Sequence, residues 1–177
     1  MRKEFLASGR GGQGILLLGH VLGLAVAKYT ELYVTGTESY DSETRGGDSK
    51  IDLIIADRPD ELDYFKVRRA GIALFMYPDQ MLKYKHLVRP DATVFLDTTF
   101  CTEPAVETWE VVKAPYTDIA EKELGAHVVA NMVALGHVIK RTGLIPPDAV
   151  VSSIQEVVRR RWVSIDIKAF KKGLSLP

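Results

Sequence analysis

The sequence predicts a single α/β domain over residues 1–177, a three-layer Rossmann-like sandwich with a mostly parallel sheet. Two observations lead to this prediction. Short apolar runs such as residues 72–77 (IALFMY) and 93–97 (TVFLD) are typical of strands buried inside parallel sheets. These runs alternate with segments of helical spacing, and the chain has no internal repeat or low-complexity linker to divide it.

The N-terminal part is expected to supply three strands and one long helix. Residues 4–8 form a short buried strand, and residues 13–28 form a helix that is apolar on nearly all sides. Residues 32–37 and 50–56 (KIDLIIA) form the next two strands. The polar segment between them contains a Gly-Gly pair and is expected to be a loop.

The C-terminal part is expected to alternate strands with helices in the same way. Strands are predicted at residues 72–77, 93–97 and 108–115, and helices at residues 78–88, 117–143 (one helix or two) and 146–161. Asp79 is predicted to cap its helix, and Gly143 is predicted to end the long helical region. The tail at residues 165–177 is short, basic and amphipathic.

Composition excludes several classes of function. The formal net charge is +0 and the pI is about 6.9, which gives no reason to expect nucleic acid or an anionic membrane as a partner. A net charge near zero fits a subunit whose surface is normally covered. No apolar run is long enough to span a membrane, and the N-terminus has no signal-peptide pattern, so a cytoplasmic location is expected.

The cysteine and histidine content does not predict a metal or redox centre. Cys101 is the only cysteine, and one thiol cannot form an internal disulfide, a Cys₄ zinc site or an iron–sulfur cluster. No neighbouring residue is placed to activate it as a nucleophile. His20 lies in the first apolar helix and is expected to be a packed or hydrogen-bonded core histidine.

The segment GRGGQG, from Gly9 to Gly14, follows the first strand and opens the first helix. Its spacing fits G-x-G-x-x-G, and backbone N–H groups at such a turn attract an anion. Arg10 adds a positive charge. A dinucleotide site would need an acid about 20 residues further on, and Glu38 falls late for that role. A tight turn that binds nothing remains the alternative.

The segment SYDSETRGG, from Ser39 to Gly47, follows the second strand. In a parallel sheet it would lie beside the glycine turn, at the carboxyl edge where ligands gather. Tyr40 offers an aromatic face, Arg45 offers a planar fork of donors, and Gly46 and Gly47 allow a sharp turn. A solvated loop without a ligand is the alternative interpretation.

Together these two segments resemble the gamma subunit of the 2-oxoacid:ferredoxin (acceptor) oxidoreductases. The family pattern is a G-x-G-G-Q-G turn followed by a Ser-Tyr-x-x-x-x-Arg-Gly-Gly block. Residues 127–146 and 165–173 resemble the family's later helices, so the resemblance covers nearly the whole chain. One departure is Asp41-Ser42, where members often have Gly-Pro. The chain length is closer to the compact 2-oxoglutarate-type subunits than to the longer pyruvate-type ones.

The resemblance implies a non-catalytic subunit of a complex that decarboxylates a 2-oxoacid oxidatively to an acyl-coenzyme A, with ferredoxin as acceptor. It implies alpha, beta and possibly delta partner subunits, which would carry thiamine diphosphate, magnesium and iron–sulfur clusters. The isolated chain, with its docking surface exposed, is expected to be able to form a homodimer. The residues expected to contact coenzyme A are Gly9, Arg10, Gly11, Gly12, Gln13, Gly14, Tyr40, Arg45, Gly46 and Gly47.

Two other functions remain open at this point. The first is a stand-alone NAD(P)- or FAD-binding oxidoreductase. The second is a purely structural assembly subunit with a vestigial ligand turn.

Overall fold

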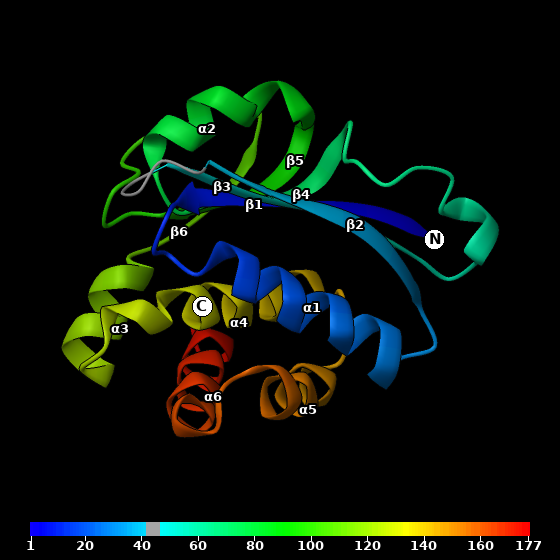
Figure 1. Cartoon of the computed structure of the whole chain (residues 1–177). Coiled ribbons are helices and arrows are strands. Elements are labelled where there is room, and N and C mark those ends of the chain that lie inside the picture. The colour runs from blue at the N-terminus through cyan, green and yellow to red at the C-terminus, as the bar shows by residue number, and fades with distance from the viewer. Residues whose placement is uncertain (42–46) are drawn as a thin grey trace.

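The computed structural model describes residues 1–41 and 47–177, and within this part six strands form one sheet (Figure 1). The strands are β1 (Arg2–Arg10), β2 (Tyr33–Tyr40), β3 (Asp48–Ala56), β4 (Ala70–Phe75), β5 (Val88–Asp97) and β6 (Glu110–Ala114). The helices are α1 (Ile15–Tyr29), α2 (Pro78–Tyr84), α3 (Tyr116–Leu124), α4 (Ala130–Thr142), α5 (Pro147–Val157) and α6 (Arg160–Leu174). Short 3₁₀ turns occur at Pro59–Glu61, Lys85–Leu87 and His127–Val129.

The sheet has the order β2-β3-β1-β4-β5-β6 and is mostly parallel, as predicted. Strands β1, β4, β5 and β6 run in the same direction, whereas β3 is antiparallel to β1 and β2 is antiparallel to β3. The two reversals cancel, so β2 points the same way as β1. The ends of β1 and β2 therefore lie at the same edge of the sheet.

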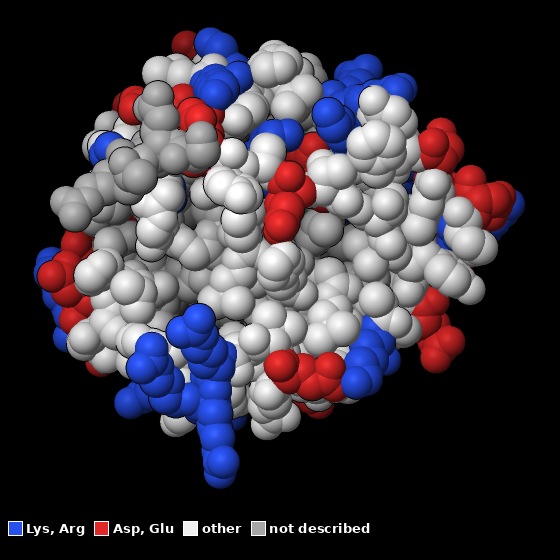
Figure 2. All heavy atoms as spheres, in the orientation of Figure 1, with Lys and Arg blue, Asp and Glu red and all other residues white. Residues whose placement is uncertain are grey.

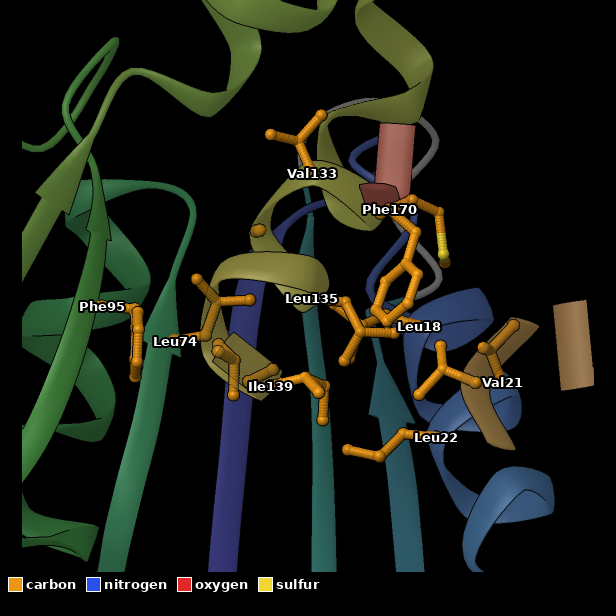
Figure 3. Packing of buried hydrophobic residues seen from close by; sticks show 14 of the residues in the cluster. Leu18, Val21, Leu22, Leu74, Phe95, Val133, Leu135, Ile139 and Phe170 are labelled. Carbon is orange, nitrogen blue, oxygen red and sulfur yellow. The ribbon is translucent and has the colours of Figure 1, made fainter. Parts of the chain in front are cut away.

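The helices cover the two faces of the sheet unequally (Figure 1). Helix α2 covers one face, while α1 and α4 cover the other, with α5 and α6 outside them. Side chains alternate between the faces along β1, so Phe5 joins the larger core and Leu6 joins the smaller core under α2. In Figure 3 the side chains of Leu18 and Leu135 lie with Phe170 between the helices of the larger core.

Two glycines let α4 and α6 pack backbone against backbone. A Cβ atom on Gly136 would overlap the carbonyl oxygen of Phe170, and one on Gly173 would overlap the carbonyl oxygen of Val133. This close contact places the C-terminal helix against α4, which in turn faces the sheet. Gly143 ends α4 in the left-handed conformation, with φ of 61°, as predicted.

Strand β2 continues through Ser39 and Tyr40, which were expected in the loop after it, and three other local predictions differ from the structure. Asp79 does not cap α2, because the helix begins at Pro78 with Tyr77 at the cap position and no side-chain cap bond. The predicted helix at residues 146–161 is divided, since α5 ends at Val157 and α6 begins at Arg160. His20 lies on the outer side of α1, where it is exposed rather than packed in the core.

No helix in the part of the chain that the structure describes is long and apolar enough to cross a lipid bilayer.

Candidate functional site

The turn between β1 and α1 requires glycine at two positions. Gly12 has φ of 91°, and Gly14, at the N-cap of α1, has φ of 73°. Residues with a Cβ atom rarely adopt these angles, so the chain path itself explains part of the glycine spacing. Gly14 makes no side-chain cap bond, which leaves the start of α1 open for another acceptor.

Gln13 braces the turn against two strands. Its side-chain oxygen accepts a hydrogen bond from the N–H of Arg10 at 2.7 Å, and its side-chain nitrogen donates to the carbonyl of Met76 at 3.0 Å. The N–H of Gln13 also donates to the carbonyl of Arg10 at 3.1 Å. Both polar atoms of this side chain therefore hold the turn in shape, so Gln13 acts through the backbone rather than by pointing at a ligand.

Asn131, at the start of α4, holds the other end of the turn. Its Nδ2 donates to the carbonyl of Gly14 at 3.0 Å, and its Oδ1 accepts from the N–H of Met132 at 2.8 Å. The side chain is buried, and a Cβ atom on Gly14 would collide with its Nδ2. Sequence reasoning missed this residue, because it lies 117 positions away from Gly14 and carries no local signal.

The two predicted segments meet at one hydrogen bond. The N–H of Gly11 donates to the carbonyl of Gly47 at 2.7 Å. In residues 1–41 and 47–177, the N–H groups of Gly12, Gly14 and Ile15 have no hydrogen-bond acceptor. These three groups lie at the positive end of the α1 dipole, which is the arrangement that favours an oxyanion.

Arg10 supplies the positive charge at this edge. Its Nη1 donates to the hydroxyl of Tyr77 at 3.0 Å, and its Cζ lies 4.6 Å from the centre of the Tyr77 ring. The Tyr77 ring is in turn 5.3 Å from that of Phe100, which is partly exposed. Within the described residues no carboxylate lies within 4 Å of Arg10, so its charge is not neutralised there.

Tyr40 lies at the same edge as the turn. Ser49 pairs with Gly9 on one side and with Tyr40 on the other, so Tyr40 is two strand spacings, about 10 Å, from Gly9. Its side chain is 67% exposed, which leaves the aromatic face available for a contact. Arg45 and Gly46, predicted in the same segment, lie outside the described residues.

Asp48 joins the start of β3 to α2. It accepts hydrogen bonds from Gln80 at 2.7 Å and from Tyr84 at 3.2 Å, and it pairs with Lys83. Burial opposes ionisation of this carboxyl, but the hydrogen bonds from Lys83, Gln80 and Tyr84 outweigh it and lower the pKa of Asp48. Asp48 pairs with Arg10 in the sheet register, so these bonds fix α2 beside the site.

Glu38 is engaged with His20. Nε2 of His20 lies 2.7 Å from a carboxylate oxygen of Glu38, and both side chains are exposed. The pair joins β2 to α1, away from the free N–H groups of the glycine turn. Glu38 is therefore not directed at a ribose bound there, in agreement with its late position in the sequence.

Cys101 is a structural residue. It is fully buried, and its Sγ lies 3.8 Å from the carbonyl of Phe75. Burial, together with the charge of Asp97, raises the pKa of the Cys101 thiol to about 12. The residues that the structure describes contain no group of three or more His, Cys, Asp or Glu side chains that would hold a metal ion.

The family follows from comparison of the whole chain with known proteins. Residues 4–176 match the family model described as pyruvate ferredoxin/flavodoxin oxidoreductase. The chain belongs to this family. The predicted resemblance is thus confirmed, and the match extends well beyond the glycine turn.

Individual curated relatives match the chain along nearly its whole length. A protein of Methanothermobacter marburgensis named 2-oxoglutarate synthase subunit KorC is 34% identical, with 99% of this chain and 97% of that protein covered. The protein of the same name from Methanocaldococcus jannaschii is also 34% identical, with coverage of 98% and 92%.

Solved structures share the fold. The gamma subunit of a keto/oxoacid ferredoxin oxidoreductase from Geobacter sulfurreducens has a TM-score of 0.83 at 26% identity, covering 97% of this chain and 95% of that one. A chain of 2-oxoglutarate:ferredoxin oxidoreductase from Magnetococcus marinus, solved with 2-oxoglutarate, coenzyme A and succinyl-CoA, has a TM-score of 0.84 at 18% identity. That match covers 98% of this chain and 30% of the longer one.

Proposed function

We propose that this chain is the gamma subunit of a 2-oxoglutarate:ferredoxin oxidoreductase and that its glycine turn holds a phosphate group of coenzyme A in the assembled enzyme. The observation that carries the site is the set of three N–H groups, on Gly12, Gly14 and Ile15, with no acceptor in the described part of the chain. The substrate is proposed from the relatives named KorC, which match nearly end to end.

The residues of the turn have separate roles in this proposal. The N–H groups of Gly12, Gly14 and Ile15 donate to phosphate oxygens, and Arg10 adds a charge-assisted contact from the side of Tyr77. Gln13 and Asn131 hold the turn in its binding shape. Tyr40 borders the ligand, and Arg45 is proposed as a second anion contact.

The chemistry of the reaction belongs to partner subunits in this proposal. Thiamine diphosphate, magnesium and iron–sulfur clusters would be held by alpha, beta and delta chains, with ferredoxin as the electron acceptor of the complex. The one cysteine of this chain is buried with a raised thiol pKa, which fits a subunit that carries no cluster.

The outer surface of the chain fits a subunit covered by others. Figure 2 shows that the face over α1 and β2 carries few charged side chains. Leu16, Leu17 and Leu24 of α1 are only half-buried, although a solvated helix normally has a polar outer face. A partner subunit covering this face would bury them.

The test uses the complex assembled with its partner subunits. Arg10→Gln removes the charge and should raise the KM for coenzyme A about tenfold, while the KM for 2-oxoglutarate stays unchanged. Arg58→Gln is the matched control, since Arg58 is exposed and paired with Asp60 in a turn outside the site. An equal KM for coenzyme A in the wild-type and Arg10→Gln complexes would refute the contact.

The substrate is tested separately by dye reduction. The wild-type complex should reduce an artificial acceptor with 2-oxoglutarate and coenzyme A, and more slowly with pyruvate. Faster turnover of pyruvate would contradict the proposed substrate without affecting the proposed site.

A purely structural subunit is the second candidate, because Gly11, Gln13 and Asn131 already give the turn a role in folding. It predicts that Arg10→Gln leaves every kinetic constant unchanged once the complex has assembled.

A further inference from the structure

A large cleft lies at the opposite edge of the sheet from the glycine turn. It has a volume of about 1010 Å³ and is lined by residues of β1, β4, β5 and β6, the segment before β4 and the end of α4. Strand β1 runs from the cleft at Arg2 to the turn at Arg10, and eight steps of about 3.3 Å separate them by about 26 Å. A ligand in the cleft would therefore be separate from one at the turn.

Cationic side chains outnumber acidic ones in this cleft. The cations that line it are Arg2, Lys3, Arg68, Arg69, Arg89 and Arg141, and the acids that line it are Glu4, Asp63 and Glu110. The chain as a whole has a net charge of +0, so the positive charge is concentrated here and balanced elsewhere. A concave surface on which one sign of charge predominates raises the local concentration of ions of the opposite sign.

The acids of the cleft are largely used by the fold. Glu4 is buried, pairs with Arg2 at 2.8 Å, and accepts hydrogen bonds from the backbone N–H groups of Arg68 and Arg69, both at 2.9 Å. Arg89 pairs with Asp91 at 2.6 Å. Among the described residues, no carboxylate lies within 4 Å of the side-chain nitrogens of Lys3, Arg68 or Arg69.

The backbone of Arg68 and Arg69, and the side chain of Arg68, are held in place before any ligand binds. Glu4 fixes their backbone, and the Arg68 guanidinium lies 3.8 Å above the centre of the Tyr64 ring. The Tyr64 ring is stacked on Phe65 at 5.0 Å between centres, which gives the arginine a firm support. A stacked guanidinium keeps its fork of N–H donors in one plane, the geometry that matches two oxygens of a phosphate group.

We propose that this cleft binds a small anion with a di- or triphosphate group. Several cations without acidic partners would neutralise more charge than one phosphate carries, and the cleft is large enough for a ligand of nucleotide size. This site is independent of the proposed coenzyme A contact, because it uses the other edge of the sheet.

The test measures binding of inorganic pyrophosphate to the full chain by isothermal titration calorimetry at low salt. One equivalent should bind with a Kd below about 1 mM, and added salt should weaken it. The double substitution Arg68→Ala/Arg69→Ala should weaken binding about tenfold or more. Backbone amide signals of residues 2–4 and 68–71 should shift in NMR spectra as pyrophosphate is added.

Arg160→Ala/Arg161→Ala is the matched control. Arg160 and Arg161 are also exposed, and Arg161 has an aromatic neighbour, Trp162. The double substitution removes the same charge as the one in the cleft. It should leave the Kd unchanged within about twofold. Arg10→Gln should also leave the Kd unchanged, which separates the cleft from the glycine turn.

Three results would overturn the proposal. The first is no saturable binding of pyrophosphate up to about 10 mM, well above the expected Kd. The second is equal weakening by the two double substitutions, which would indicate attraction to net charge alone. The third is binding of an acidic peptide such as hexaglutamate at least as tightly as pyrophosphate, which would assign the cleft to a protein partner.

Discussion

The side-chain amide of Asn131 donates a hydrogen bond to the carbonyl of Gly14 at 3.0 Å, joining the start of α4 to the start of α1. The same side chain accepts from the N–H of Met132, so one buried residue serves two helix ends. Substitution by alanine would leave the Met132 N–H without this acceptor and create a small cavity.

Asn131→Ala should therefore lower the free energy of unfolding by about 1–3 kcal/mol. Urea denaturation followed by circular dichroism measures this change. Gln155→Ala is the control, since Gln155 is exposed on α5, and it should change stability by less than about 0.5 kcal/mol. Equal midpoints for Asn131→Ala and the wild type would contradict the structural role given to Asn131.

Gly14→Ala should be destabilising for two separable reasons. The positive φ of 73° is unfavourable for alanine, and the new Cβ atom would collide with Nδ2 of Asn131. In the Asn131→Ala background only the first reason remains, so the penalty should fall by about 1 kcal/mol. A double-mutant cycle measures the difference between the two backgrounds. If Gly14→Ala costs the same in both, the collision with Asn131 does not contribute to the loss of stability.

Gly136→Ala should separate α4 from α6. The added Cβ atom would meet the backbone of Phe170, which cannot move without shifting the whole helix, so a loss of about 3 kcal/mol is expected. Gly23→Ala is the matched helix substitution, because no atom lies within 4 Å of its Cβ position, and it should stabilise the chain by up to about 1 kcal/mol. Thermal unfolding of both variants measures the contrast, and similar losses would argue against close packing at Gly136.

Asp166 should make stability depend on pH. Burial raises the pKa of this carboxyl to about 6, above its value in the unfolded chain, so the folded state holds the proton more tightly. The contribution of Asp166 to the free energy of unfolding is fully present at pH values below the unfolded pKa. It is lost as the pH rises from there through about 6. Asp166→Asn should therefore stabilise the chain at pH 7.5, by at most about 3 kcal/mol, and have little effect at pH 4.

The measurement is urea denaturation at both pH values. A gain of the same size at pH 4 and pH 7.5 would show that the asparagine acts through packing rather than through loss of a charge. Asp148→Asn, at an exposed position in the first turn of α5, is the control and should show no such gain at either pH.

Local sequence signals predicted the strands and the glycine turn well. The apolar run at residues 72–77 and the glycines at positions 12 and 14 act over a few residues, and their effect does not depend on the rest of the fold. The direction of β3 was not predicted, because it depends on which neighbour the strand finds and on nothing within its own apolar pattern.

The wrong and missed predictions have two physical causes. One is a helix that is apolar on nearly all sides, and the other is contact between residues far apart in the sequence. His20 was placed in the core because α1 is apolar on nearly all sides, so its pattern does not separate the inner face from the outer one. The partners of the turn, Asn131 and Met76, lie far from it in the sequence, and no local sequence pattern indicates these contacts.

The brace formed by Gln13 has a consequence for the thermodynamics of ligand binding. Because its side chain already bonds to Arg10 and Met76, the glycine turn has few backbone states left to lose when an anion arrives. Ordering a free loop would oppose binding by about 1–2 kcal/mol for each residue fixed. Here that entropy is lost during folding, so hydrogen exchange of the bonded Arg10 and Gln13 amides should be slow with or without the ligand, whereas exchange at the free amides should be slowed only by the ligand.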